Sequence, residues 1–356
     1  MPDDRISLRQ LLTLTFAALL SPAIQLLPGS TARRAGEAGW LATLAALPVL
    51  LGLCWLLWRL FRGGLPNTAQ QLLGPTLGRV FCLLYFLWGL YLLAANARQV
   101  ALRFLTISYR NAPMVLFLLA LLGVTFWLVR KPVRALARAG EVFFLTLAAG
   151  LALSLLLGAF QVDTANLLPV WVEDLPAVGW ATLPVLGLLG YVVFAPCLGG
   201  HVVPEEGSRR KILRWAVGLC LTLTALQVVC LGNFGPGLAG RMDTPFFMMV
   251  KGIGFEGTFQ RMESVIIALW VLADLALLSL LACACSELAQ KGFAIQKRST
   301  AVLPIILAAA AGAIWLFPDA FALDQALEGP VLWGGILFGL GGPLLLFVIS
   351  LFRKRG

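Results

Sequence analysis

The chain has 356 residues, of which 60% are hydrophobic and only 12% are charged. A soluble domain is typically about 45–50% apolar and about 25% charged, so this composition excludes a soluble globular protein with a charged surface. The net charge of +10 comes from short basic clusters between apolar runs, and not from the continuous basic face of a nucleic-acid-binding protein. We therefore expect one transmembrane domain over 1–356, embedded in the lipid bilayer, and no nucleic-acid partner.

The apolar runs predict ten transmembrane helices. A spanning helix needs about 20 mostly apolar residues. Cutting the chain at its charged residues leaves nine uncharged runs, and a tenth apolar stretch contains Glu263 and Asp274. The runs do not alternate in polarity as barrel strands do, so the chain is predicted to be all-α. The predicted spans are 10–32, 38–58, 80–97, 111–129, 142–162, 175–204, 215–240, 258–286, 299–318 and 329–352.

Basic residues between the predicted spans indicate the orientation of the chain. If the N-terminus is cytoplasmic, 19 of the 27 Lys and Arg residues fall in cytoplasmic segments, including Arg353, Lys354 and Arg355. The loops at 163–174 and 319–328, which would then be external, contain acidic residues and no Lys or Arg. This positive-inside pattern predicts a multi-pass protein of the cell membrane with both termini cytoplasmic.

Two predicted helices contain residues that interrupt helices. Pro22 in the first span removes one amide donor and crowds the preceding turn, which indicates either a binding-site break or a simple kink. The sixth span is rich in glycine and proline and is long enough for two half-helices. Paired interruptions at matching positions of two halves are typical of transporters built from inverted repeats. We therefore predict two five-helix repeats, about 7–160 and about 175–352, with broken first and sixth helices.

A ligand site is predicted where these two helices meet, at mid-membrane. Free amides at half-helix N-termini suit a carboxylate and free carbonyls at C-terminal ends suit an ammonium group, so a zwitterionic amino acid matches both. Gly190 would let a ligand approach the backbone, and Gly190→Leu should then fill the site without unfolding the protein. The predicted ligand-binding residues are Ser21, Pro22, Ala23, Gln25, Gly187, Gly190, Tyr191 and Phe194.

Ionisable side chains within the spans predict a second feature of the site. Charges in a bilayer are costly and normally have partners in the protein interior. We expect a network of Arg98, Glu263 and Asp274 with an Arg98–Glu263 pair, unless these two side chains extend to the membrane interface. Asp274 is too deep for that and must pair, hydrate or be protonated. His201, the single histidine, is either a proton relay or a solvated residue near the interface.

The sequence lacks common motifs of enzymes and metal sites. There is no GxSxG, GxxxxGKS/T or HExxH motif, and none of the seven cysteines forms a CxxC pair. Cysteines within apolar runs are typically packing residues. We predict that the protein is not an enzyme and has no cofactor and no metal site.

The segment FQRMESVIIALWVLADLALL at 259–278 resembles a signature of the membrane-embedded B subunit of bacterial endospore germinant receptors. The aromatic residue, arginine, glutamate and tryptophan of that signature are matched by Phe259, Arg261, Glu263 and Trp270. Shorter stretches resemble the same family in order and spacing, among them RISLRQLLTLTFAALLSPAIQLLP, LPNTAQQLLGPTLGRVFCLLYFLWGLY and ARAGEVFF.

This resemblance implies the amino acid/polyamine/organocation superfamily, with ten helices in a LeuT-like pair of inverted repeats and a site between spans one, three, six and eight. It implies a subunit that senses a small nutrient, usually an amino acid, in the spore inner membrane, together with an A subunit and a lipoprotein C subunit. A sensor subunit is therefore the leading hypothesis. A secondary amino acid transporter of the same superfamily is the alternative, and a structural membrane scaffold is the third.

Overall fold

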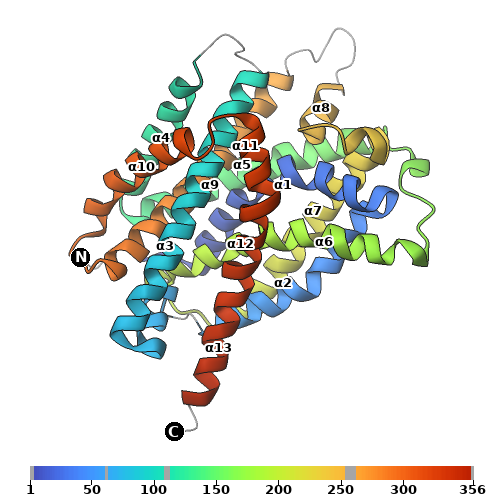
Figure 1. The fold of residues 1–356 in the computed structure, drawn as a ribbon. Helices are drawn as coiled ribbons and strands as arrows, with labels where there is room; N and C mark the ends of the chain where they lie inside the picture. The colour runs from blue at the N-terminus through green and yellow to red at the C-terminus, as the bar shows by residue number, and fades with distance from the viewer. Residues whose placement is uncertain (1–3, 61–62, 108–112, 253–261, 354–356) are drawn as a thin grey trace.

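The computed structural model describes residues 4–60, 63–107, 113–252 and 262–353, and this part of the chain is helical apart from short connections (Figure 1). The η elements are 3₁₀-helices except η5 and η6, which are π-helices. In chain order the elements are α1 (Leu8–Ala35), η1 (Gly36–Trp40), α2 (Leu41–Leu60), α3 (Leu65–Ile107), α4 (Met114–Arg130), α5 (Val133–Ala159), η2 (Thr164–Asn166), η3 (Val172–Asp174), α6 (Leu175–Leu189), η4 (Gly190–His201), α7 (Ser208–Ala239), α8 (Pro245–Gly252), α9 (Met262–Gly292), α10 (Arg298–Trp315), α11 (Ala320–Ala326), η5 (Leu327–Val331), α12 (Leu332–Ile336), η6 (Leu337–Gly341) and α13 (Gly342–Arg353).

The number of apolar helices agrees with the predicted number of spans. By length and composition, eight helical segments of the described chain can cross a membrane, and the first, Leu8–Leu60, contains both α1 and α2. The shorter apolar helix α4, Met114–Arg130, provides one more. Within the described residues, ten apolar segments therefore result when α1 and α2 are counted separately. The all-α prediction is confirmed.

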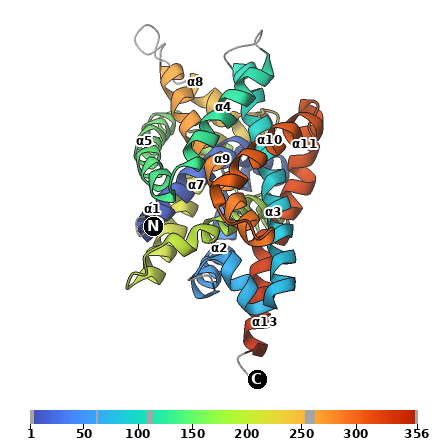
Figure 2. The ribbon, with the colours of Figure 1, turned by 90° about the vertical axis from the view of Figure 1, so that its left-hand side faces the viewer.

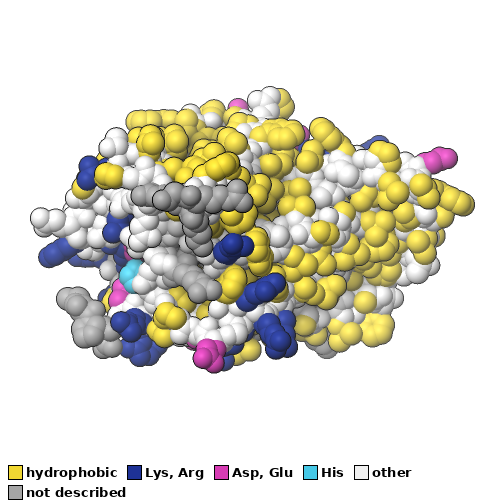
Figure 3. Space-filling view, turned by 90° about the horizontal axis from the view of Figure 1, so that it is seen from below, with side chains coloured by type: hydrophobic (Ala, Val, Ile, Leu, Met, Phe, Trp, Pro, Cys, Tyr) yellow, Lys and Arg dark blue, Asp and Glu magenta, His cyan; other side chains and the backbone are white. Residues whose placement is uncertain are grey.

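The outer surface of the bundle is apolar, as expected for helices that face lipid. Leu145 on α5 is 72% exposed, and Trp315 at the end of α10 is 82% exposed. In Figure 3 hydrophobic side chains cover broad areas, whereas Lys and Arg side chains gather toward the left and lower edges. A soluble protein would bury such a large apolar surface, so the exposed side chains agree with a membrane environment.

Helix α9 lies at the centre of the bundle and positions much of the site (Figures 1 and 2). It packs against α1, α3, α5 and α10. Its buried turns contain small residues, among them Ala273, Ala276 and Ala284, which allow neighbouring helices to approach closely. Side chains from α1, α3 and α9 can therefore meet in the interior.

The two helices predicted to be broken differ from each other. α1 remains helical through both Pro22 and Pro28, so the chain is not interrupted at the predicted position in the first span. Proline removes one backbone hydrogen bond, and groups packed around a membrane helix can compensate for that loss. In the sixth span the α-helix gives way to a 3₁₀-helix at Gly190. The interruption there is a change of helix type and not an unwound join.

Three other spans depart from a regular helix, and in α7 the departure is at Gly235 (φ 70°, ψ 160°). In α3, non-helical torsions at Gly74 (φ 83°, ψ 176°) separate the first turns from the long transmembrane part. That part extends beyond the predicted 80–97 because Arg79, Arg98 and Arg103 lie within the helix. In the tenth span, the π-helical segments η5 and η6 flank α12. Such segments often occur at functional sites.

Candidate functional site

A buried ion pair joins α3 to α9 in the interior of the bundle. Arg103 Nη1 lies 3.2 Å from Asp274 Oδ2, and Arg103 Nη2 lies 3.3 Å from Asp274 Oδ1. The two side chains are only 6% and 2% exposed. Such a pair is tolerated away from water only when its geometry is good and its remaining polar atoms are hydrogen-bonded.

Two residues of α1 supply those hydrogen bonds. The Ser21 hydroxyl donates to Asp274 Oδ1, and Gln25 Oε1 accepts from Arg103 Nη2 at 2.6 Å. Ser21 and Gln25 are four residues apart, so they share one face of α1. Both were predicted from the sequence to bind a ligand. The four residues Ser21, Gln25, Arg103 and Asp274, which we call the central cluster, therefore link three helices.

Trp270 covers the guanidinium of the central cluster. It precedes Asp274 by four residues, so both side chains lie on one face of α9. Arg103 Cζ lies 4.9 Å from the centre of the indole ring, in a cation–π geometry. Trp270 Nε1 is buried and has no hydrogen-bond partner within the described residues. The indole therefore shields the ion pair from water and leaves a donor in the same region.

The start of η4 contacts α3 through two aromatic residues predicted for the site. The Tyr191 hydroxyl oxygen accepts a hydrogen bond from Asn96 Nδ2 at 3.1 Å, and both residues are buried. Phe194 is fully buried, and its ring lies against Gly89, where a Cβ would come within 3.0 Å of Phe194 Cε1. Phe194 is therefore a packing residue between η4 and α3, whereas Tyr191 also borders a cavity.

This cavity, of about 70 Å³, lies between α1, α6 and the beginning of the tenth span. Pro22, Gly187 and Tyr191 line it. Two further lining residues, Arg33 and Glu328, form an exposed ion pair with 3.0 Å between Nη2 and Oε1. The cavity therefore extends from charged, exposed side chains to the α1 residue that follows Ser21.

The chain is similar to known proteins over nearly its whole length. A family model described as spore germination protein matches residues 5–319. This chain belongs to the spore germination protein family. It is 24% identical over 370 residues to spore germination protein KB of Bacillus subtilis (strain 168), covering 100% of this chain and 97% of that protein. The family resemblance seen in the sequence is confirmed.

Solved structures define the fold of this spore germination family member. A Na⁺-coupled sialic acid symporter in a substrate-bound, outward-open state is similar with a TM-score of 0.65 and 12% identity, covering 94% of this chain and 79% of that chain. MhsT in complex with L-phenylalanine is similar with a TM-score of 0.66 and 15% identity, covering 94% and 88%. The LeuT-like fold class is confirmed. The repeat boundaries at about 7–160 and about 175–352 stay a prediction.

The glycines predicted for the site pack against another helix. A Cβ at Gly190 would collide with the Gly335 carbonyl oxygen, and one at Gly187 would lie 2.9 Å from the Leu332 carbonyl oxygen. The close approach that Gly190 allows is therefore to α12 and not to a ligand. Ala23 is fully buried and is absent from both the central cluster and the cavity lining. The expectation that Gly190→Leu would leave the protein folded is corrected by this geometry.

Of the predicted charge network, Asp274 pairs with Arg103, and Arg98 contacts other groups. Arg98 Nη2 donates to the Pro318 carbonyl oxygen at 2.6 Å, and its Nη1 lies 3.2 Å from Met114 Sδ. Arg98 therefore holds the chain after α10 against α3 and α4. Arg261 and the side chain of Glu263 lie outside the described residues, so the Arg98–Glu263 pair stays a prediction.

Sequence reasoning missed Arg103, which is the actual partner of Asp274. A signal was present, because Gln99 and Arg103 are polar residues four apart within an apolar helix, and both are buried. Two buried polar side chains on one face indicate that this face meets other polar groups. Cutting the span at charged residues concealed this pattern.

His201 is held by hydrogen bonds at the end of η4. Its Nε2 lies 3.0 Å from Glu287 Oε1, and its Nδ1 lies 3.1 Å from the Asp4 carbonyl oxygen. Nearby, Ile6 N donates to the His201 carbonyl oxygen and Val203 N donates to the Ile6 carbonyl oxygen, each at 2.9 Å. His201 thus helps attach the N-terminal segment to η4 and α9. The sequence had suggested either a proton relay or a solvated residue, and not this structural role.

Proposed function

We propose that this chain is the membrane-embedded nutrient-sensing subunit of a spore germinant receptor and binds an amino acid at the central cluster. The observation that carries the proposal is the buried Arg103–Asp274 pair, which is bonded to Ser21 and Gln25 of the first span. Intramembrane ionisable residues typically mark substrate or ion sites. The cluster joins spans one, three and eight, in agreement with the site that the family resemblance implies.

The charges of the central cluster match those of a zwitterion. An α-carboxylate replacing Asp274 on Arg103 would keep a bidentate guanidinium contact. The ligand ammonium would then bind the released Asp274 carboxylate, so that both buried charges stay paired. A simple anion or a simple cation would leave one buried charge without its partner, which is strongly unfavourable. Trp270 Nε1 offers a further donor.

A zwitterion bound between Arg103 and Asp274 would change the arrangement of the helices, and this change would be the sensing step. The ligand must come between Arg103 and Asp274, and therefore between α3 and α9, which are in direct contact in this structure. The cavity beside Pro22 and Tyr191 is the proposed route to them. A ligand shifts a conformational equilibrium by its differential affinity for the two states. An amino acid would therefore favour the arrangement with these two helices separated.

The proposed setting is the spore inner membrane, with both termini cytoplasmic and with A-type and lipoprotein C-type subunits that detect the rearrangement. The alternative is a secondary amino acid transporter, which the similarity to MhsT in complex with L-phenylalanine favours. Gradient-driven uptake of labelled amino acid into liposomes that contain only this chain would support the transporter. Binding without uptake would support the sensor.

The central test measures binding to the full chain in lipid nanodiscs. A panel of labelled amino acids is compared with matched analogues that lack either the amino group or the carboxylate. We expect at least one amino acid to bind and both of its analogues to bind more than tenfold more weakly. Equal binding of either analogue would contradict the zwitterion site, as would the absence of binding by every amino acid.

Ser21→Ala is the informative variant because it removes one hydrogen bond and keeps both charges. A hydrogen bond to a charged group is worth about 1.5 kcal/mol or more, so the affinity should fall about tenfold. Arg9→Gln is the control, since it removes an exposed ion pair between Arg9 and Glu141 far along α1. Equal affinities of the two variants would place the ligand elsewhere.

A further inference from the structure

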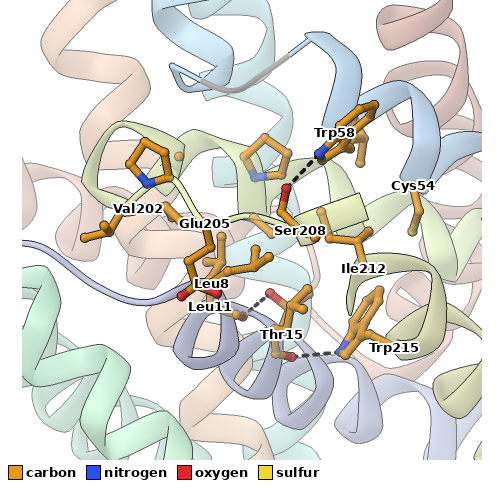
Figure 4. A pocket seen from close by; sticks show the side chains of 18 of the residues that line it. Leu8, Leu11, Thr15, Cys54, Trp58, Val202, Glu205, Ser208, Ile212 and Trp215 are labelled. Atoms are coloured by element: carbon orange, nitrogen blue, oxygen red, sulfur yellow. Dashed lines mark hydrogen bonds between the residues drawn. The ribbon is translucent and has the colours of Figure 1, made fainter. Parts of the chain in front are cut away.

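A second and larger cavity, of about 600 Å³, lies at the end of the bundle where α1 and α7 begin. Its walls come from the first turns of α1, the end of α2, η4, the connection 202–207 and the first turns of α7 (Figure 4). This volume is within the range of about 300–1,000 Å³ that is common for small-molecule sites. The central cluster does not contribute to its lining.

The interior of this cavity is apolar. Its deep wall includes Leu11, Leu57 and Val192, all of which are buried. Two indoles form further parts of the wall, and the protein engages both of their N–H groups. Trp58 Nε1 donates to Ser208 Oγ and Trp215 Nε1 donates to the Leu12 carbonyl oxygen, each at 2.9 Å (Figure 4). The wall therefore suits an apolar or aromatic body.

The charged residues of the lining are both acidic. Glu205 and Glu206 lie on the connection between η4 and α7, and no Lys, Arg or His is among the residues that line the cavity. A hydrogen bond from Lys211 holds Glu205, and this bond lowers the pKa of the Glu205 carboxyl group. Glu205 is therefore ionised at neutral pH. In Figure 4 its carboxylate lies beside Leu8 and Leu11, where the polar rim meets the apolar wall.

We propose that this cavity is a second ligand site for an amphipathic monoamine, with the apolar body between Trp58 and Trp215 and the ammonium group at Glu205 and Glu206. Charge complementarity favours the cation, because the lining contains two carboxylates and no Lys, Arg or His. Lys211, outside the lining, engages Glu205, so Glu206 is the carboxylate without a basic partner among the described residues. Indole rings also attract a cation that lies over their faces. The site goes beyond the proposed amino acid site and takes a ligand without a carboxylate.

The proposal is tested with 2-phenylethylamine as the probe. Its binding to the full chain in nanodiscs is measured by scintillation proximity, with protein-free nanodiscs as background. We expect saturable binding and competition in the order 2-phenylethylamine, 2-phenylethanol, 3-phenylpropionate. Unsaturable binding, or equal competition by the alcohol, would overturn the proposal.

Substitutions of Glu205 and Glu206, the carboxylates at the rim of the cavity, test whether the probe binds there. Glu206 is exposed, so Glu206→Gln should leave the fold intact and weaken binding of the probe about threefold. The double variant Glu205→Gln/Glu206→Gln should weaken it about tenfold. Glu173→Gln removes an exposed carboxylate before α6 and serves as the charge-matched control with unchanged affinity. Equal effects of Glu206→Gln and Glu173→Gln would contradict the site.

Two further measurements separate this site from the central cluster. Ser21→Ala should not change the affinity for 2-phenylethylamine, whereas Ala195→Leu, on the wall of the larger cavity, should reduce it. A saturating amino acid that binds at the central cluster should not displace the probe. If Ser21→Ala lowers the affinity for the probe and Glu206→Gln does not, the amine binds at Asp274 and the second site is wrong.

Discussion

Arg103 and Arg98 show how neighbours decide the role of a charged residue in a membrane helix. They are five residues apart on α3, which places their side chains about 140° apart around the helix axis. Arg98 accordingly contacts Pro318 and Met114, whereas Arg103 contacts α1 and α9. The cost of burying Arg103 is offset jointly by a carboxylate, an amide and an indole ring.

Removal of one partner of this pair should strongly destabilise the protein. Arg103→Gln and Asp274→Asn should each cost about 3–5 kcal/mol, because each removes one charge of a buried, hydrogen-bonded ion pair. The double variant Arg103→Gln/Asp274→Asn should be at least as stable as the less stable of the two single variants. Thermal unfolding of the three variants in nanodiscs measures this coupling, together with the fraction of monodisperse protein recovered from the membrane.

The double variant Arg98→Gln/Asp274→Asn is the control for the double-mutant cycle of Arg103 and Asp274. Arg98 is also buried, but its hydrogen bonds go to Pro318 and Met114. The two losses should therefore add to within about 0.5 kcal/mol. Additive losses for Arg103 and Asp274 as well would mean that the ion pair is not coupled.

At the scale of elements, glycines set the contact between the sixth and tenth spans. Gly187 and Gly190 bring α6 and η4 against Gly335 and Gly339 at near backbone contact. In lipid, helices associate through close van der Waals packing, and small residues at their interface permit it. The close contact occurs at the junction of α6 with η4 and at the turns around α12. The closest packing between these two spans therefore occurs where their helices are irregular.

Gly190→Leu should consequently reduce the amount of folded protein. The new side chain would enter the space of the Gly335 backbone, which cannot move as a flexible side chain can. We expect a loss of stability of more than about 3 kcal/mol, above the usual range for overpacking. Gly179→Leu, on α6 in the same span, is the matched control, because nothing lies within 4 Å of a Cβ there. If both variants unfold at the wild-type temperature, the predicted tight contact is wrong.

At the scale of the whole molecule, the distribution of basic residues predicts the direction of the chain in the membrane. The basic residues gather toward one part of the surface in Figure 3, and hydrophobic side chains cover much of the remainder. An even number of spans places both termini on one side. The larger cavity opens at the connection 202–207, immediately before the basic residues that begin α7. If the termini are cytoplasmic, as the charge pattern predicts, the mouth of this cavity faces the cytoplasm.

Reporter fusions test this orientation. A reporter that is active only outside the cell should be silent when fused after Gly356, because the basic C-terminal residues resist translocation. The same reporter inserted in the acidic loop 163–174 should be active. The reverse pattern would invert the topology, and activity at both positions would exclude ten spans.

The sequence by itself determined the helical class and the family, and its ten apolar runs agree with the apolar segments of the described chain. A bilayer demands about 20 apolar residues for each helix and satisfaction of every backbone group, so composition and spacing are sufficient for those conclusions. Ser21 and Gln25 were also singled out for their place beside Pro22, and Asp274 for its depth in the membrane. Ligand binding by Ser21 and Gln25 stays a prediction. These inferences depend on the position of a residue along the chain and on its chemistry.

Only the tertiary structure decided which residues meet. Asp274 pairs with Arg103, which was not part of the predicted network. Gly190 faces α12 and not a ligand, and α1 continues through Pro22. Each of these facts depends on the rotation of a helix about its axis and on the surface packed against it. A rotation of about 100° separates successive residues of an α-helix. The depth of a residue can therefore be inferred from the sequence, whereas its direction is set by the packing of the whole bundle.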